Sequence, residues 1–272
     1  MIKDILIAVA VVVSIGIICG IVLTLASHFM AVKKDEKAEK LRAVLPGVNC
    51  GACGYTGCDG YAAALAKGEA KPNLCVPGAD KVSAEISNIL GISFEDVEEM
   101  TAFVHCNGNN SDSRKKSEYE GIKSCKAAAL VYGGPRACVY SCLGFGDCAA
   151  VCPSNAICVK DGVARVDPRR CIGCGLCVKT CPKKIISLIP VTAKTAVICS
   201  NKEKGVFVRK ECKNGCIACK KCEMNCPDGA IKVIDNLAVI DYKKCTRCGI
   251  CADVCPVKCI KKTDFSASPL TE

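Results

Sequence analysis

Cysteines at a regular spacing are the residues of this sequence with the clearest chemistry. The motif C-x2-C-x2-C-x3-C-P occurs three times in the chain. Three thiolates two residues apart can bind one [4Fe–4S] cube, and where two cubes are neighbours the cysteine before proline binds the other one. Zinc sites use separated pairs of ligands on a tetrahedron, so the motif favours iron–sulfur clusters over zinc. The three copies are Cys171, Cys174, Cys177 and Cys181, then Cys216, Cys219, Cys222 and Cys226, then Cys245, Cys248, Cys251 and Cys255.

The chain also repeats itself with an offset of 74 residues, so that residues 152–181 align with residues 226–255. In each copy, two short apolar segments flank a two-residue turn, Asp161-Gly162 or Asp235-Asn236. These residues tolerate positive φ and are typical of tight β-hairpins. We therefore predict two compact α+β modules, each with a hairpin and with short helices between the cysteine triplets and the next strand.

The first module departs from the motif at its start, where the spacing is Cys138-x3-Cys142-x5-Cys148-x3-Cys152. The repeat aligns Cys138 with Cys212 and places Phe145 where the second module has a cysteine, so we predict that Cys138 replaces the missing ligand. With the exchange of the fourth cysteine between neighbouring cubes, four clusters follow. Their predicted ligands are Cys138, Cys142, Cys148 and Cys181; Cys171, Cys174, Cys177 and Cys152; Cys216, Cys219, Cys222 and Cys255; and Cys245, Cys248, Cys251 and Cys226.

A fifth set of cysteines lies nearer the N-terminus, in a glycine-rich segment. Its members are Cys50, Cys53, Cys58 and Cys75. Glycines let the backbone approach an inorganic core and direct N–H groups at its sulfides. This set predicts one more [4Fe–4S] cluster, which makes five.

Seven cysteines remain. Cys19, Cys158 and Cys259 occupy apolar surroundings, where a free thiol behaves as a small hydrophobic residue. The other four lie just outside the modules, and they either hold a sixth cluster or are buried thiols. These four are Cys106, Cys125, Cys199 and Cys212.

Composition supports a chain organised around inorganic cofactors. Its 272 residues have a hydrophobic share of 50%, but that share includes 27 cysteines, and there is no tryptophan. Large apolar side chains are therefore too few for an ordinary core. The formal charge is +10. A [4Fe–4S]²⁺ core with four thiolates carries about −2, so five clusters would contribute about −10 and balance this excess.

The N-terminus predicts a membrane anchor. Residues 5–26 form an uncharged run of 22 residues, which as a helix would extend about 33 Å and cross a bilayer. A signal peptide has a shorter apolar region, of about 7–15 residues. The run leads into Lys33, Lys34, Lys37, Lys40 and Arg42. The positive-inside rule then places the following domains in the cytoplasm, anchored to the inner (cytoplasmic) membrane, where thiols stay reduced.

Three segments resemble one family. GVNCGACGYTGCDGYAAALAKGE, CVYSCLGFGDCAAVCP and NGCIACKKCEMNCP are similar to the iron–sulfur motifs of the B subunit of Rnf complexes. The resemblance implies a membrane assembly that couples electron transfer from reduced ferredoxin to NAD⁺ with Na⁺ or H⁺ translocation. This subunit would accept electrons from soluble ferredoxin and relay them to subunits that carry flavin or NAD. The alternatives are a polyferredoxin subunit of another membrane reductase or hydrogenase, and a zinc-bound structural or regulatory protein.

The predicted fold class is α+β, with one N-terminal transmembrane helix, a small iron–sulfur domain and two tandem bacterial-type two-cluster ferredoxin modules. The predicted segments are 1–30 (anchor), 31–104 (N-terminal 4Fe-4S domain), 105–137 (connector), 138–190 (first module), 191–211 (connector), 212–263 (second module) and 264–272 (tail). No catalytic constellation is visible, so the chain by itself is an electron carrier. Its anchor contains no ionisable group, so ion movement falls to partner subunits.

Basic residues near the modules are either a docking face for an acidic ferredoxin or a solvated surface. They are Lys183, Lys184, Lys220, Lys221, Lys243, Lys244 and Arg247. A basic surface can also bind nucleic acid, but an anchored chain with an aromatic content of only 4% is not of that kind.

Overall fold

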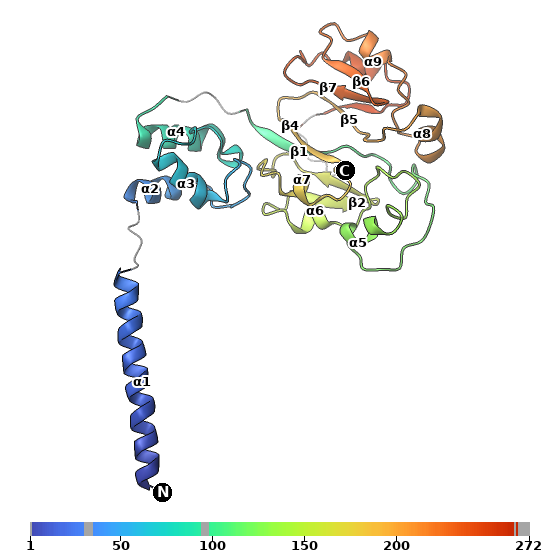
Figure 1. Ribbon diagram of the computed structural model, residues 1–272. Helices are drawn as coiled ribbons and strands as arrows, with labels where there is room; N and C mark the ends of the chain where they lie inside the picture. Colours follow the sequence, from blue (N-terminus) through green and yellow to red (C-terminus); the bar gives the residue numbers. More distant parts are fainter. Residues whose placement is uncertain (1, 30–34, 94–97, 264, 266–272) are drawn as a thin grey trace.

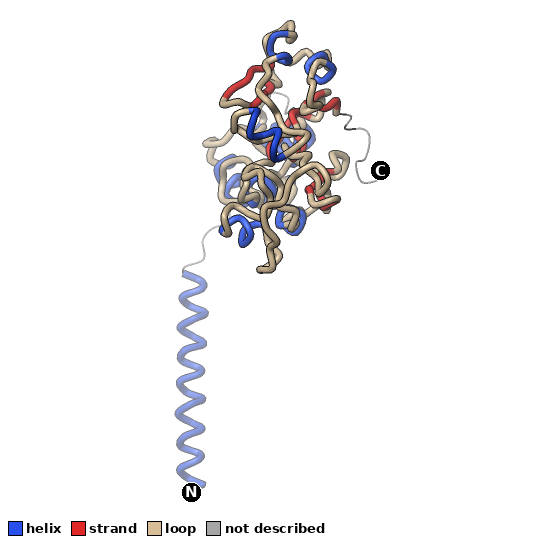
Figure 2. The backbone as a smooth tube through the Cα atoms, turned by 90° about the vertical axis from the view of Figure 1, so that its right-hand side faces the viewer, coloured by secondary structure: helices blue, strands red, loops and turns tan. Residues whose placement is uncertain are grey.

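The computed structural model describes residues 2–29, 35–93, 98–263 and 265. The first helix, α1 (Ile2–Phe29), projects from the rest of the chain in both views (Figures 1 and 2). Residues Ile5–Ala26 make it long and apolar enough to cross a membrane, and none of that window is buried. Large side chains such as Leu6 and Leu23 are exposed around it. A helix that is apolar on all sides and touches no protein core is suited to a lipid environment.

A small helical domain follows. It contains α2 (Glu36–Val44), α3 (Cys58–Ala66), a 3₁₀ turn (Val76–Gly78) and α4 (Ala79–Leu90). Asp35 caps α2 by accepting the N–H of Lys37 (2.9 Å). The fully buried side chains Leu41, Tyr61 and Ile86 come one from each helix. Their burial fixes the loops that carry the N-terminal cysteines.

Four antiparallel strand pairs make up the two modules. They are β1 (Met100–Val104) with β4 (Ile186–Pro190), β2 (Ile157–Lys160) with β3 (Val163–Val166), β5 (Thr195–Val197) with β8 (Ile260–Lys262), and β6 (Ile231–Ile234) with β7 (Leu237–Ile240). β2–β3 and β6–β7 are the predicted hairpins. Asp161, Gly162, Asp235 and Asn236 all have positive φ, between +49° and +74°. The predicted turn residues are therefore confirmed.

Short helices begin within the cysteine triplets, slightly earlier than predicted. They are α6 (Asp147–Ala150), α7 (Leu176–Thr180), α9 (Lys221–Met224) and α10 (Ile250–Asp253). Each follows a residue with positive φ: Gly146, Gly175, Lys220 or Gly249. This turn directs the chain around a centre, so that successive cysteines can point to one place.

The outer strand of each module comes from a segment that the sequence pattern left outside it. β1 lies in the predicted N-terminal domain and β5 in the predicted second connector, yet they pair with β4 and β8. Two further helices, α5 (Cys125–Leu130) and α8 (Gly205–Glu211), follow these strands along the chain and precede the first triplets (Figure 1). The partners β1 and β4 lie more than 80 residues apart, and such pairing leaves no local pattern in the sequence, whereas hairpins do.

Candidate iron–sulfur sites

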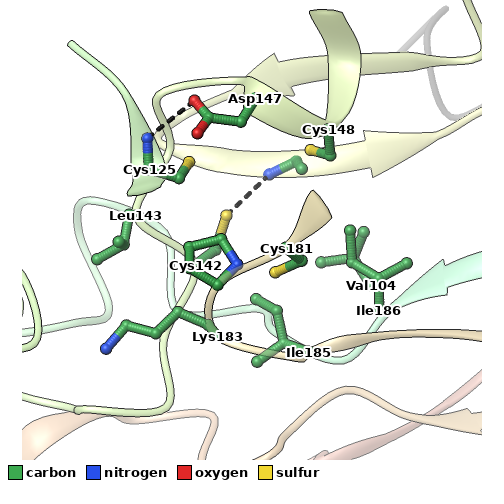
Figure 3. Close-up of a pocket in the computed structure, with 12 residues that line it drawn as sticks. Val104, Cys125, Cys142, Leu143, Asp147, Cys148, Cys181, Lys183, Ile185 and Ile186 are labelled. Atoms are coloured by element: carbon green, nitrogen blue, oxygen red, sulfur yellow. Dashed lines mark hydrogen bonds between the residues drawn. The ribbon is translucent and has the colours of Figure 1, made fainter. Parts of the chain in front are cut away.

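Four thiols line a cavity in the first module, and one of them is not from the predicted set. The lining thiols are Cys125, Cys142, Cys148 and Cys181 (Figure 3); we name this the Cys142 site. The structure does not bring Cys138 here. The predicted grouping of Cys138 with Cys142, Cys148 and Cys181 is therefore corrected, because Cys125 occupies that place.

Helix α5 carries Cys125 to the Cys142 site. The Asp147 carboxylate accepts hydrogen bonds from the Ser124 hydroxyl (2.9 Å) and from the N–H groups of Cys125 (2.8 Å) and Lys126 (3.0 Å). Partial burial would raise the pKa of Asp147, but these bonds outweigh it and hold the pKa below its usual value. A charged cap of this kind fixes the first turn of a helix. The turn that it fixes contains the thiol.

Cys138 lies instead in a second cavity, together with three cysteines that the motifs did not place. The lining thiols are Cys106, Cys138, Cys199 and Cys212; we name this the bridging site. Cys106 and Cys199 each lie two residues after the first strand of a module, β1 or β5. Cys138 and Cys212 are the pair that the 74-residue repeat aligns. The site is thus built from equivalent positions of the two modules, two thiols from each.

Polar groups around the bridging site point at its sulfurs. The Asn201 side chain, which is 1% exposed, donates from Nδ2 to Cys138 Sγ (3.3 Å). The Asn201 N–H donates to Cys199 Sγ (3.4 Å), and the Cys142 N–H donates to Cys106 Sγ (3.4 Å). Such donors favour the charged form of sulfur and orient it.

A buried arginine adds positive charge beside this site. Arg136 is 5% exposed, and its guanidinium donates to the carbonyls of Gly108, Asn109 and Gly162 and to Asn110 Oδ1. Within the described residues it forms no ion pair with a carboxylate. Burial raises the pKa of Cys106, and the charge of Arg136 acts against that effect. A buried cation needs a nearby anion.

The other four predicted groups of cysteines are each brought together. They are Cys50, Cys53, Cys58 and Cys75 (the N-terminal site); Cys152, Cys171, Cys174 and Cys177 (the Cys174 site); Cys216, Cys219, Cys222 and Cys255 (the Cys219 site); and Cys226, Cys245, Cys248 and Cys251 (the Cys248 site). The last of these groups lines a cavity of its own.

Burial makes several of these thiols poor acids without a metal. It raises the pKa of Cys138, Cys148 and Cys177 to about 12, with the neighbouring thiols adding to the effect at Cys148 and Cys177. Because a metal binds the thiolate and releases the proton, such a site stays protonated until iron neutralises the charge.

The arrangement suits a multi-iron cluster better than a single ion. All 27 cysteines are free thiols. Within the described residues, no three His, Cys, Asp or Glu side chains lie close enough together to hold one metal ion. The thiols lie in groups of four, three of which line cavities. Backbone N–H groups donate to sulfur, as from Ala156 to Cys152 (3.3 Å) and from Cys259 to Cys255 (3.2 Å). This is the donor set of a [4Fe–4S] cube.

Family models match the same regions of the chain. Residues 45–77 match a model described as "Putative Fe-S cluster", and residues 142–156, 164–187 and 238–261 match models described as "4Fe-4S binding domain". None of these segments includes a residue of the bridging site.

Three relatives cover nearly the whole chain. The B subunit of the Na⁺-translocating ferredoxin:NAD⁺ oxidoreductase complex of Acetobacterium woodii is 40% identical over 96% of this chain and 78% of its own length. The B subunit of the proton-translocating ferredoxin:NAD⁺ oxidoreductase complex of Clostridium ljungdahlii is 42% identical over 91% of this chain and 88% of its own length. The B subunit of the ion-translocating oxidoreductase complex of Methanosarcina acetivorans is 36% identical over 93% of this chain and 97% of its own length. The chain belongs to the family of Rnf B subunits.

The resemblance seen in the cysteine motifs is thus confirmed, and this Rnf protein is an iron–sulfur electron-transfer subunit. Sequence reasoning missed the residues that support its sites: Arg136, Asp147 and Asn201. Cys259 was predicted to be a simple core residue, and it is 1% exposed. Its thiol also hydrogen-bonds with the sulfurs of Cys199 and Cys216, which lowers the pKa of both. The sequence had singled out Cys106, Cys199 and Cys212 as candidates for a sixth cluster, but it grouped them with Cys125, and the structure places Cys138 there instead.

Proposed function

We propose that this subunit holds six [4Fe–4S] clusters and relays electrons from reduced ferredoxin towards the membrane subunits of an Rnf complex. The observation that carries the proposal is the gathering of 24 of the 27 cysteines into six groups of four. Each cluster, when bound, supplies a one-electron centre. The ligands of the sixth would be those of the bridging site, and Cys125 would serve the Cys142 site.

The six sites follow one another in a single line. The Cys50 thiol of the N-terminal site lies close enough to the Cys174 thiol to raise its pKa. Between the same two segments, Lys179 Nζ donates a hydrogen bond to the Cys50 carbonyl (2.9 Å). The Cys174 and Cys142 sites share the first module. There the Cys177 thiol of one site lies close enough to Cys148 of the other to raise its pKa. These contacts support two links, one between the N-terminal site and the Cys174 site and one between the two sites of the first module.

The remaining links pass through the bridging site. The Cys142 N–H donates to Cys106 Sγ and so joins the first module to it. On the other side, the Cys259 thiol lies between Cys199 of the bridging site and Cys216 of the Cys219 site. The Cys219 and Cys248 sites share the second module. Without the bridging site, the line would be interrupted between the modules.

The anionic charge expected at the bridging site accounts for Arg136. A [4Fe–4S]²⁺ core with four thiolates carries about −2, and the buried guanidinium would partly balance it. Four neutral thiols would leave that cation balanced only by the carbonyl and amide oxygens that it contacts, because it forms no ion pair among the described residues. We therefore favour a cluster over four buried thiols at these positions.

The anchor gives this relay an orientation. The lysines that follow the apolar helix in the sequence favour a cytoplasmic position for the soluble domains, where the proposed ferredoxin donor would reach them. The N-terminal site follows α1 in the chain and would be the last centre before the membrane partners. Residues 5–26 contain no charged group, so Na⁺ or H⁺ would cross in another subunit.

Iron and sulfide analysis of the anaerobically purified chain tests the cluster count. With four irons per cube, six clusters give about 24 irons per chain and five give about 20. Cys138→Ala should lower the count by about one cube and leave the Cys142 site intact. Cys158→Ala, outside every group, is the matched control and should change nothing. A count of about 20 in the unaltered chain would contradict the bridging cluster, and zinc without sulfide would contradict the whole proposal.

A further inference from the structure

We call the middle position of each triplet an end of its module. These positions are Phe145 (where the first module lacks the cysteine), Cys174, Cys219 and Cys248. They differ in what covers them, and so they differ in whether an electron donor can approach.

Both ends of the first module are covered. The Phe145 ring packs edge-on against Tyr119, with ring centroids 5.5 Å apart. Cys174 is 8% exposed. Beside it, a Cβ added to Gly173 would lie 3.1 Å from Val76 of the N-terminal domain. Neither end of this module leaves a ligand open to a partner.

Both ends of the second module are open, because Cys219 and Cys248 are exposed. Only one of them ends the line of sites. The Cys219 site adjoins the bridging site through Cys259, whereas the Cys248 site has a neighbour on one side only. If electrons entered at Cys219, the Cys248 site would be a side branch that leads nowhere. If electrons instead enter at Cys248, the Cys248 site is the first centre of the relay and every site lies on the path.

The surface beside Cys248 is positively charged. Lys243, Lys244 and Arg247 are exposed, and none of them forms an ion pair with another described residue. Of the nearby carboxylates, Asp253 pairs with Lys262 (2.8 Å). Asp228 and Asp241 are exposed; Asp228 accepts a hydrogen bond from Thr246, and Asp241 accepts the N–H of Lys243 (3.1 Å). Three cationic side chains therefore stand against two carboxylates, so the excess charge at this end is cationic.

We propose that the surface formed by Lys243, Lys244, Arg247 and the exposed Cys248 is the docking face for the electron donor, a small redox protein with an acidic surface. This inference rests on the proposed function and names where its donor binds. Opposite charges would steer the donor to this end and place its centre next to an exposed ligand, within short range of the first cluster. The donor would lose one electron, and the Cys248 cluster would gain it.

Stopped-flow reduction of the cluster-loaded full chain tests the docking face. The donor is an acidic two-[4Fe–4S] ferredoxin, reduced beforehand, and dithionite serves as a small reductant that needs no docking. Lys243→Glu/Lys244→Glu should slow reduction by ferredoxin about 10-fold or more at low ionic strength, and the difference should shrink as salt screens the charges. Its iron content and its rate with dithionite should match those of the unaltered chain.

Lys220→Glu/Lys221→Glu is the matched control, because it makes the same charge change beside the other exposed cysteine of the same module. It should slow reduction by less than about 3-fold. If it slows reduction as much as the first variant, or if neither variant slows it, the docking face is overturned while the relay stands. If ferredoxin does not reduce the unaltered chain although dithionite does, the proposed function fails, and the docking face with it.

Discussion

At the scale of single residues, the chain controls its sulfurs by placing donors and charges around them. Asn201 donates hydrogen bonds to two sulfurs of the bridging site, from its side-chain amide to Cys138 Sγ and from its backbone N–H to Cys199 Sγ. Arg136 sits beside the same site with its guanidinium held by carbonyl oxygens. Hydrogen bonds to sulfur and nearby positive charge both stabilise the reduced, more negative form of a cluster. These residues would therefore set the potential of the middle centre.

Replacing Asn201 tests this influence. Asn201→Leu removes the donor to Cys138, and a hydrogen bond to a charged sulfur differs between oxidation states by about 1 kcal/mol, or about 40 mV for one electron. We expect the potential of one cluster to fall by about that amount, in a redox titration followed by electron paramagnetic resonance. Asn225→Leu, on the surface of the second module, should leave all potentials unchanged. A uniform shift of every cluster in Asn201→Leu would indicate unfolding and contradict the assigned role.

At the scale of elements, the repeat supplies two similar frames, and insertions make them different. The hairpins β2–β3 and β6–β7 and the short helices at the triplets recur at the 74-residue offset. The first module has in addition α5, which fills the place of the missing triplet cysteine with Cys125. α5 has only six residues, and such a short helix is not stable by itself. Its position depends on the Asp147 cap.

Asp147→Ala should therefore weaken α5 and the Cys142 site together. Losing hydrogen bonds from one hydroxyl and two N–H groups should lower the free energy of unfolding by about 1–3 kcal/mol. It should also loosen Cys125, so that one cube loses iron. Thermal unfolding and iron content measure the two effects. Asp253→Ala, which removes an exposed ion pair, is the control and should cost less than about 1 kcal/mol. Full iron content in Asp147→Ala would contradict the role of the cap.

At the scale of the whole molecule, the six proposed sites would form a series of neighbours from the N-terminal domain to the second module. Cysteines make up much of the packed interior: the main cluster of the first module includes buried Cys106, Cys142, Cys148 and Cys177. Six clusters at about −2 each would also cancel the formal charge of +10. Steering of a partner must then come from local groups of lysines and not from the net charge.

Interrupting the line at its middle gives a prediction for the assembled complex. Cys106→Ala/Cys199→Ala should still allow ferredoxin to reduce the second module at the normal rate. NAD⁺ reduction by the complex should fall at least about 10-fold, because electrons would have to cross the space of a missing centre. A rapid-mixing experiment that follows cluster bleaching and NADH formation separates the two steps. Unchanged NADH formation, with one cube lost, would contradict a single-file relay.

The sequence by itself determined the chemistry of this protein, because three of the four ligands of each regular ferredoxin cluster lie within seven residues of one another and leave a local pattern. It also determined the hairpins, whose turn residues are local too. Only the tertiary structure decided how the solitary cysteines combine. Cys106, Cys138, Cys199 and Cys212 come from four separate segments, and nothing in their spacing distinguishes Cys138 from Cys125. The long-range pairing of β1 with β4 and the Asp147 contact decide which thiol faces which cavity.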